Sequence, residues 1–153
     1  PMLMAGYRLR PDLDAEALVD GWLVTADRGE LSAEGTLRVL GRTDDVVVTG
    51  GENVSADDVA AVLAGHPDLA DAAVTGVADE QWGQRLVAVV VARAGHSAPA
   101  VGDLRSWCAD RLAAAARPQG IVVVDAIPRL SSGKLDRRAV ARLADAASGD
   151  PSG

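Results

Sequence analysis

The residues best suited to chemistry form a polar stretch near the C-terminus, Pro128–Arg137, in which Gly133 precedes Lys134. A glycine followed by a lysine in a polar loop is typical of phosphate-binding sites. The P-loop pattern does not fit. It requires a glycine at the position of Pro128 and a serine or threonine at the position of Leu135. Lys134 is therefore either a solvated surface charge or a phosphate-directed cation outside the P-loop architecture.

Other short motifs precede this stretch in a fixed order. They are Gly21–Asp27 (GWLVTAD), Gly41–Asp45 (GRTDD), Thr49–Val54 (TGGENV), His66–Pro67, Asp79–Gly83 and Val124–Pro128. Together with Pro128–Arg137, they resemble the C-terminal part of the acyl-adenylate-forming superfamily, which includes acyl-CoA synthetases, peptide-synthetase adenylation domains and luciferases. The resemblance covers about Gly21 to Leu143. Because several independent motifs appear in one order, a chance match is very improbable.

The resemblance implies an ATP-dependent enzyme that joins a carboxylic acid to AMP and then passes the acyl group to the thiol of coenzyme A. The roles it implies are adenylation catalysis by Lys134, nucleotide binding by Asp27 and Arg42, a hinge at Asp44, and a path for the pantetheine arm past Gly50 and Gly51. The carboxylate and the α-phosphate are both anionic, so an ammonium on a flexible stem would stabilise their crowded transition state. No metal-binding residue is expected, since the histidines and the cysteine show no ligand spacing.

Plainer interpretations of the same residues stay open. Arg42 would equally suit a surface ion pair with Asp44 or Asp45, and the Gly50–Gly51 pair would suit a simple turn between a strand and a helix. The sequence also departs from the superfamily, because Ala115–Pro118 (AARP) stands where Y-K-x-P is usual. Any phosphate contact made there must fall to Arg117 or be absent.

The elements that must position these residues follow from the hydrophobic pattern. Gly21–Arg42 is predicted to be a β-hairpin of Trp22–Val24 and Thr36–Leu40, because a turn signal separates the two segments. Further strands are predicted at Val46–Val48, Ala72–Val77, Leu86–Ala92 and Ile121–Val124, and helices from Ser55 to Gly65, from Asp103 to Arg117 and from Asp136 onward. Without a regular βαβ repeat, this order favours an α+β fold, in which a small mixed or antiparallel sheet is packed with three helices and preceded by a β-hairpin.

The domain organisation follows from the same pattern. We expect residues 1–43 to hold the end of a large N-terminal domain plus the hairpin, residues 44–147 the domain with the catalytic lysine, and residues 148–153 a disordered tail. The chain opens on Pro1 rather than methionine, so we expect a fragment that is inactive by itself. Its implied partner is the N-terminal domain, which would bind most of the ATP and Mg²⁺.

Composition excludes several classes of function. The formal net charge of −7 opposes binding to nucleic acid, and no apolar run approaches the roughly 20 residues of a membrane span. A single cysteine, Cys108, fits a reducing cytoplasm. Within the superfamily the chain is most similar to the o-succinylbenzoate–CoA ligases of menaquinone biosynthesis, in which the small acid and coenzyme A are substrates. The alternatives are a ligase that loads a carrier protein and a non-catalytic module that keeps the fold; the intact protein could also be a homo-oligomer.

Overall fold

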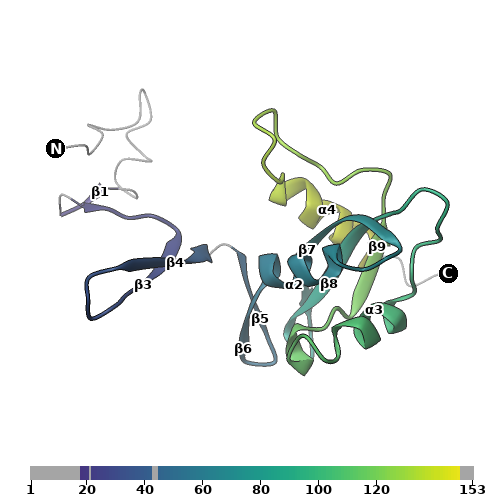
Figure 1. The fold of residues 1–153 in the computed structure, drawn as a ribbon, viewed down its shortest axis with the longest axis horizontal. Coiled ribbons are helices and arrows are strands. Elements are labelled where there is room, and N and C mark those ends of the chain that lie inside the picture. Colours follow the sequence, from purple (N-terminus) through teal and green to yellow (C-terminus); the bar gives the residue numbers. More distant parts are fainter. Residues whose placement is uncertain (1–17, 21, 43–44, 149–153) are drawn as a thin grey trace. The chain divides into compact units, whose positions relative to one another are not determined.

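The computed structural model describes residues 18–20, 22–42 and 45–148, and it divides the chain into two units, residues 1–44 and 45–153 (Figure 1). Each unit is described by itself. The predicted hinge residue Asp44 lies outside the described residues, and so does the predicted tail beyond Ser148.

The first unit contains two antiparallel strand pairs among its described residues. Strand β1 (Leu18–Val19) pairs with β2 (Trp22–Leu23), and β3 (Asp27–Leu31) pairs with β4 (Leu37–Arg42). The predicted hairpin is therefore present, but its first strand is Asp27–Leu31 and not Trp22–Val24. The turn decides this, because Ser32 N donates to Thr36 O (2.9 Å) and places Leu31 opposite Leu37.

The second unit is built on a mixed five-stranded sheet, with one strand more than the four predicted for this part of the chain. Its strands are β5 (Val46–Thr49), β6 (Glu52–Ser55), β7 (Leu69–Asp79), β8 (Gly83–Ala92) and β9 (Gly120–Val123). The order is β6-β5-β8-β7, and β9 joins β8 as the parallel pair among otherwise antiparallel neighbours. The Gly50–Gly51 pair lies in a turn between two strands, β5 and β6, and not between a strand and a helix.

Three helices cover the sheet on two faces (Figure 1). Helices α2 (Ala56–Ala64) and α3 (Val101–Cys108) pack on one face, and α4 (Arg137–Ser148) packs on the other. Alternate residues of β8 point to the two layers: Leu86, Ala88 and Val90 to the first, Val87 and Val89 to the second. The run Leu86–Ala92 is continuously apolar because both faces of its strand are covered.

Helix α2 follows its sequence signals closely. Ser55 is the N-cap, and its Oγ accepts a hydrogen bond from Asp58 N (3.2 Å). Asp57 and Asp58 lie in the first turn, where a carboxylate is stabilised by the helix dipole. Val59 and Leu63, four positions apart, are both fully buried.

The other helix boundaries were less well predicted. Helix α3 begins at Val101, with Asp103 in the first turn, where its carboxylate accepts a hydrogen bond from Ala100 N (3.2 Å). It ends at Cys108 and not at Arg117; a 3₁₀ turn at Ala114–Ala116 follows. Aspartate is favoured both as the capping residue and in the first turn of a helix, so the pattern alone could not separate the two positions. At the C-terminus, Ser148 still belongs to α4, and its hydroxyl donates to Ala144 O (2.7 Å).

Candidate functional site

Lys134 lies on a tight hairpin between β9 and α4. Leu130 N donates to Lys134 O, and Gly133 N donates to Leu130 O, both at 2.8 Å. Gly133 has a φ of +81°, and no atom lies within 4 Å of the position that a Cβ would take there. This is the three-residue hairpin loop whose last residue is left-handed, so glycine is required by the backbone and not by crowding. The turn leaves Lys134 exposed at the tip.

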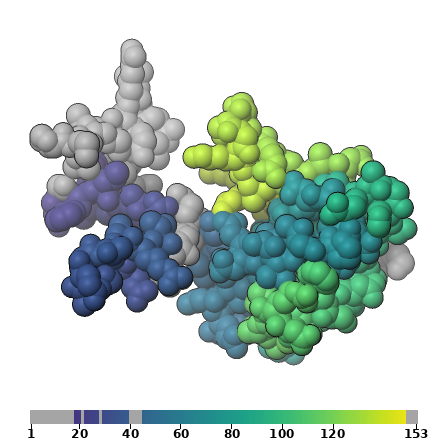
Figure 2. Space-filling view, viewed as in Figure 1, coloured from purple at the N-terminus to yellow at the C-terminus, as the bar shows by residue number. Residues whose placement is uncertain are grey.

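The base of this hairpin is held firmly by the second unit. Arg129 and Leu135 face each other across it as an isolated β-bridge. The Arg129 guanidinium pairs with Asp71 of β7 (2.8 Å), and Leu135 packs against the core layer beneath α4. Asp136 then caps α4, since its Oδ1 accepts a hydrogen bond from Ala139 N (3.0 Å). The yellow-green segment that contains this hairpin projects from the surface in Figure 2.

Arg137 forms the best-connected ion cluster in the described part of the chain. Its Nε donates to Asp45 Oδ1, and its Nη2 donates to Asp57 Oδ2 (2.9 Å). Asp45 is buried, whereas the side chain of Asp57 is 59% exposed. The hydrogen bond to Asp45 raises the pKa of Arg137 further above its already high value, so this cation stays charged. The pKa of Asp57 is raised, chiefly by its partial burial and also by repulsion from Asp45, against the attraction of Arg137.

Gly50 and Gly51 form the turn between β5 and β6. Both have positive φ, +57° and +82°, which matches the two-glycine turn that suits a hairpin. At Gly50 space is also short, because a Cβ there would lie 2.9 Å from the ring of Trp82. Gly50 N donates to Trp82 O (2.9 Å), so this turn is fixed against the start of β8.

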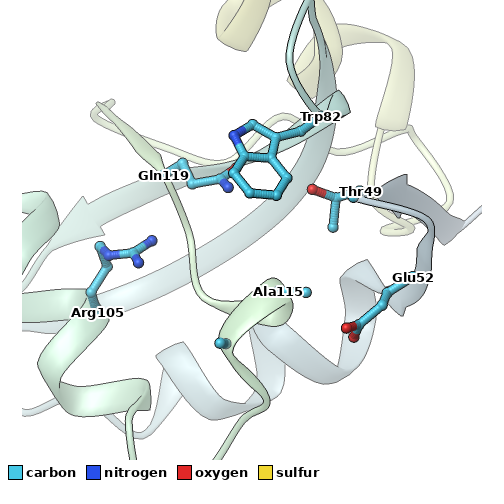
Figure 3. A pocket seen from close by; sticks show the side chains of 8 residues that line it. Thr49, Glu52, Trp82, Arg105, Ala115 and Gln119 are labelled. Carbon is cyan, nitrogen blue, oxygen red and sulfur yellow. The ribbon is translucent and has the colours of Figure 1, made fainter.

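A cavity of about 330 Å³ opens beside this turn (Figure 3). Its lining residues are Thr49, Gly50, Glu52, Trp82, Arg105, Ala114, Ala115 and Gln119. The Trp82 indole forms one wall, with Arg105 and Gln119 on one side and Thr49 and Glu52 on the other. The cavity therefore joins a flat aromatic surface to a cation, a combination suited to a ligand with both apolar and anionic parts.

The cation of this cavity was not found from the sequence. The sequence pointed to Arg117, but its guanidinium donates to Ala109 O (3.0 Å) and to Leu112 O (3.4 Å). Arg105 lines the cavity instead, with its Nη1 donating to Pro118 O (3.1 Å). No motif marks Arg105, since its bonds to the backbone carbonyls of Arg117 and Pro118 exist only in the folded chain.

The two predicted nucleotide-binding residues lie opposite each other in the first unit. In the register of the β3–β4 hairpin, Asp27 pairs with Arg42. Asp27 is exposed, and its backbone amide donates to Thr25 Oγ1 (3.3 Å). The register of the two strands therefore places the backbones of these two residues directly opposite each other.

Comparison with known proteins now identifies the second unit. The family described as the AMP-binding enzyme C-terminal domain matches residues 58–134, about half of the chain, and the match ends at Lys134. The chain belongs to this family. The matched range includes most of α2, the strands β7, β8 and β9, the helix α3 and the first part of the lysine hairpin.

Relatives and solved structures extend the similarity beyond this domain. The chain is 44% identical over 143 residues to the 2-succinylbenzoate–CoA ligase of Geobacillus kaustophilus, which covers 94% of the chain and 29% of that protein. It is 39% identical over 138 residues to the fatty acid–[acyl-carrier-protein] ligase ScoC of Streptomyces coeruleorubidus, covering 90% of the chain and 26% of that protein. The chain therefore spans less than a third of the length of these relatives.

The fold agrees with a solved ligase. The o-succinylbenzoate CoA synthetase of Bacillus subtilis, in complex with its acyl-adenylate intermediate, superimposes with a TM-score of 0.78 at 37% identity, over 90% of this chain and 28% of that one. The predicted α+β fold, with its three helices, mixed sheet and preceding hairpin, is confirmed by this match.

Two further features of the described part of the chain concern metal-ion sites and membrane-spanning helices. Among the described residues, no three His, Cys, Asp or Glu side chains gather in a way that would hold a metal ion. No helix in the described part of the chain is long and apolar enough to cross a membrane.

Proposed function

We propose that this chain is the C-terminal part of an ATP-dependent acid–CoA ligase, which forms an acyl-adenylate and then an acyl-CoA thioester. The observation that carries the proposal is the presentation of Lys134. It stands exposed next to the three-residue loop of a hairpin whose base is held by an ion pair, a partly buried leucine and a helix cap. A cation on a rigid support is able to enter a site formed by another domain.

In the first half-reaction, a carboxylate oxygen of the acid attacks the α-phosphorus of ATP. The bond from that phosphorus to the bridging oxygen breaks, and pyrophosphate leaves. Charge gathers on the α-phosphate oxygens in the transition state, and the Lys134 ammonium would stabilise it by reaching both the carboxylate and the phosphate. Lysine suits this task because it is a compact charge on a flexible stem.

Asp27 and Arg42 would bind the nucleotide from the first unit. An ionised carboxylate accepts hydrogen bonds from ribose hydroxyls, and an arginine donates to ribose or phosphate oxygens. Their positions on facing strands support a joint role, since one nucleotide would then meet both. Mg²⁺ and most contacts to ATP would come from a partner N-terminal domain.

In the second half-reaction, the thiolate sulfur of coenzyme A attacks the acyl carbonyl, and AMP leaves. The Gly50–Gly51 turn would let the pantetheine arm pass, because neither glycine presents a side chain. The adjoining cavity supports this role, since Trp82 and Arg105 would meet apolar and phosphorylated parts of the cosubstrate.

Asp44 would be the hinge between the two half-reactions. The chain divides into its two units directly after this residue, which supports the role. Lys134 and Gly50 belong to the same unit but to different hairpins. A turn about Asp44 would therefore withdraw one from the reacting atoms and bring in the other.

The acid is proposed to be o-succinylbenzoate, in a cytoplasmic enzyme that forms a precursor of menaquinone. The 44% identity to a 2-succinylbenzoate–CoA ligase supports this choice. A second candidate is a ligase that loads a carrier protein, because a fatty acid–[acyl-carrier-protein] ligase is 39% identical. Both use Lys134 in the same way and differ only in the thiol acceptor.

The partner domain is supported by apolar surface on the first unit. Large side chains there stay exposed, among them Trp22, Leu31, Leu37 and Val39. Exposed apolar surface of this kind is typical of contact regions. A large domain that holds the acid pocket would cover it.

The test uses the full-length protein with the substitution Lys134→Ala and, as a matched control, Arg138→Ala, which removes an exposed cation four residues away. Pyrophosphate release from ATP is followed with o-succinylbenzoate and with a panel of aryl and fatty acids. Thioester formation is measured separately from pre-made acyl-adenylate, with coenzyme A or a carrier protein as acceptor.

We expect Lys134→Ala to reduce adenylation by about 10²–10³-fold, as for loss of one group that stabilises transition-state charge. Thioester formation should stay near the wild-type rate, and Arg138→Ala should change neither step. Unchanged adenylation by Lys134→Ala would show that this lysine is only a surface charge. The active acid and acceptor decide between the two candidate ligases.

A further inference from the structure

Arg137 joins three segments that are far apart in the sequence. Asp45 lies 92 positions before it and Asp57 lies 80 positions before it, yet its guanidinium bonds to both. Asp45 is the first residue after the predicted hinge Asp44, and Asp57 is in the first turn of α2. Since α2 and α4 pack on opposite faces of the sheet, this one side chain ties the two layers to the start of the domain.

The connection from Arg137 back to Lys134 is short and stiff. Only two residues separate them, and the second, Asp136, caps α4 and donates its backbone amide to Pro128 O (2.9 Å). Lys134 O accepts the amide of Leu130 across the hairpin. No free segment therefore lies between the guanidinium and the backbone of the lysine.

The bond to Asp45 is the stronger half of the cluster. A buried carboxylate depends on its cation, whereas an exposed one is largely solvated and gains little from a partner. Asp45 is buried, and Asp57 is more than half exposed. Arginine serves two carboxylates at once because its donors form a planar fork, which a lysine ammonium cannot reproduce.

We propose that Arg137 is a positioning residue, which ties the base of the Lys134 hairpin to Asp45 at the start of the second unit. This tie holds the hairpin in one orientation, so that Lys134 reaches the α-phosphate in one defined position. The inference rests on the proposed adenylation role of Lys134.

The Gly50–Gly51 turn lies at the far end of the β5–β6 hairpin from Asp45 and Asp57. It is held by the β5–β6 ladder and by the bond from Gly50 N to Trp82 O. Loss of the Arg137 connection should therefore affect adenylation and spare thioester formation. A purely structural role would lower both half-reactions together.

The experiment removes the connection without leaving a buried charge unpaired. In the full-length protein, the double substitution Asp45→Asn with Arg137→Met is compared with wild type, with Lys134→Ala, and with Arg138→Met as a matched control on the next, exposed position of α4. The kcat for pyrophosphate release, the KM for ATP and the rate of thioester formation from acyl-adenylate are measured for each. Thermal unfolding confirms that each variant is folded.

We expect the double variant to lose about 10- to 100-fold in the kcat for adenylation, because a misplacement of Lys134 by about 1 Å has an effect of this size. The KM for ATP and the rate of thioester formation should stay within about twofold of wild type. If the double variant unfolds, Arg137→Lys makes the same comparison, because it keeps the charge and loses the fork. An equal fall in both half-reactions, or no fall in either, would overturn the inference. If Lys134→Ala itself adenylates normally, the proposed function fails first, and the two failures are thus distinguishable.

Discussion

Substitution of Gly133 by alanine tests whether the left-handed turn is what places Lys134. Gly133 has a φ of +81°, and no atom would touch an added Cβ. Gly95, in the loop between β8 and α3, has a φ of +80° and equally open surroundings. The two positions therefore impose the same backbone cost, and only one of them adjoins the lysine.

The size of this cost can be worked out from the backbone alone. An L-residue in the left-handed region costs about 1–2 kcal/mol. Replacing glycine also restricts the unfolded chain, which offsets about 0.4–1 kcal/mol of that cost. A net loss of about 1 kcal/mol remains for either variant. In a domain of about 100 residues, this corresponds to a fall in Tm of about 4–8 °C.

Thermal unfolding of the 153-residue chain, followed by circular dichroism, measures the loss of stability in Gly133→Ala and Gly95→Ala. Pyrophosphate release by the corresponding full-length variants measures the effect on adenylation. We expect equal losses of stability, with adenylation reduced only by Gly133→Ala. Normal adenylation by a Gly133→Ala variant that shows the expected loss of Tm would refute the reasoning, since Lys134 would then not need this turn.

Two further predictions concern stability alone. Partial burial and the nearby Asp45 carboxylate raise the pKa of Asp57, so the folded state binds a proton there more tightly than the unfolded chain does. The contribution of Asp57 to the free energy of unfolding therefore falls as pH rises from the ordinary carboxyl range through the raised pKa. Asp57→Asn should remove this pH dependence and raise Tm at pH 7 slightly. Measurement of Tm from pH 4 to 7 for wild type and variant checks this, and a lower Tm at pH 7 would show that the attraction to Arg137 dominates. At Gly76 in β7 an added Cβ would lie 2.8 Å from Val47 Cγ1, so Gly76→Ala should cost about 1–3 kcal/mol, and Val47→Ala should restore part of it in the double variant. Denaturant unfolding of the single and double variants measures the coupling, and simple additivity would contradict the predicted clash.

Local signals predicted the parts of the fold that depend on a few neighbouring residues. The cap at Ser55, the apolar spacing of Val59 and Leu63, and the glycine before Lys134 each concern a single turn of chain. They were visible in the sequence because backbone preferences and first-turn hydrogen bonds act within about four residues. The pairing of Asp27 with Arg42 followed once the hairpin turn was fixed.

Strand ends and partners were predicted less well, for a physical reason. Strand β7 runs from Leu69 to Asp79, longer than the predicted Ala72–Val77, because β8 supplies backbone partners along its whole length. Trp22–Leu23 pairs with β1 and not with the strand after the turn. An apolar strand segment does not encode which neighbour it will meet.

The sequence by itself determined that this chain carries a lysine preceded by a glycine in a polar loop, within an α+β domain of the adenylate-forming type. Only the tertiary structure decided that Arg137 meets Asp45 and Asp57, and that Arg105 instead of Arg117 faces the cavity beside Trp82. The turn before Lys134 depends on the torsional preferences of adjacent residues, for which Gly133 is a local signal. The ion cluster and the cavity join residues that are tens of positions apart, and these come together only when two layers of helices pack on the sheet.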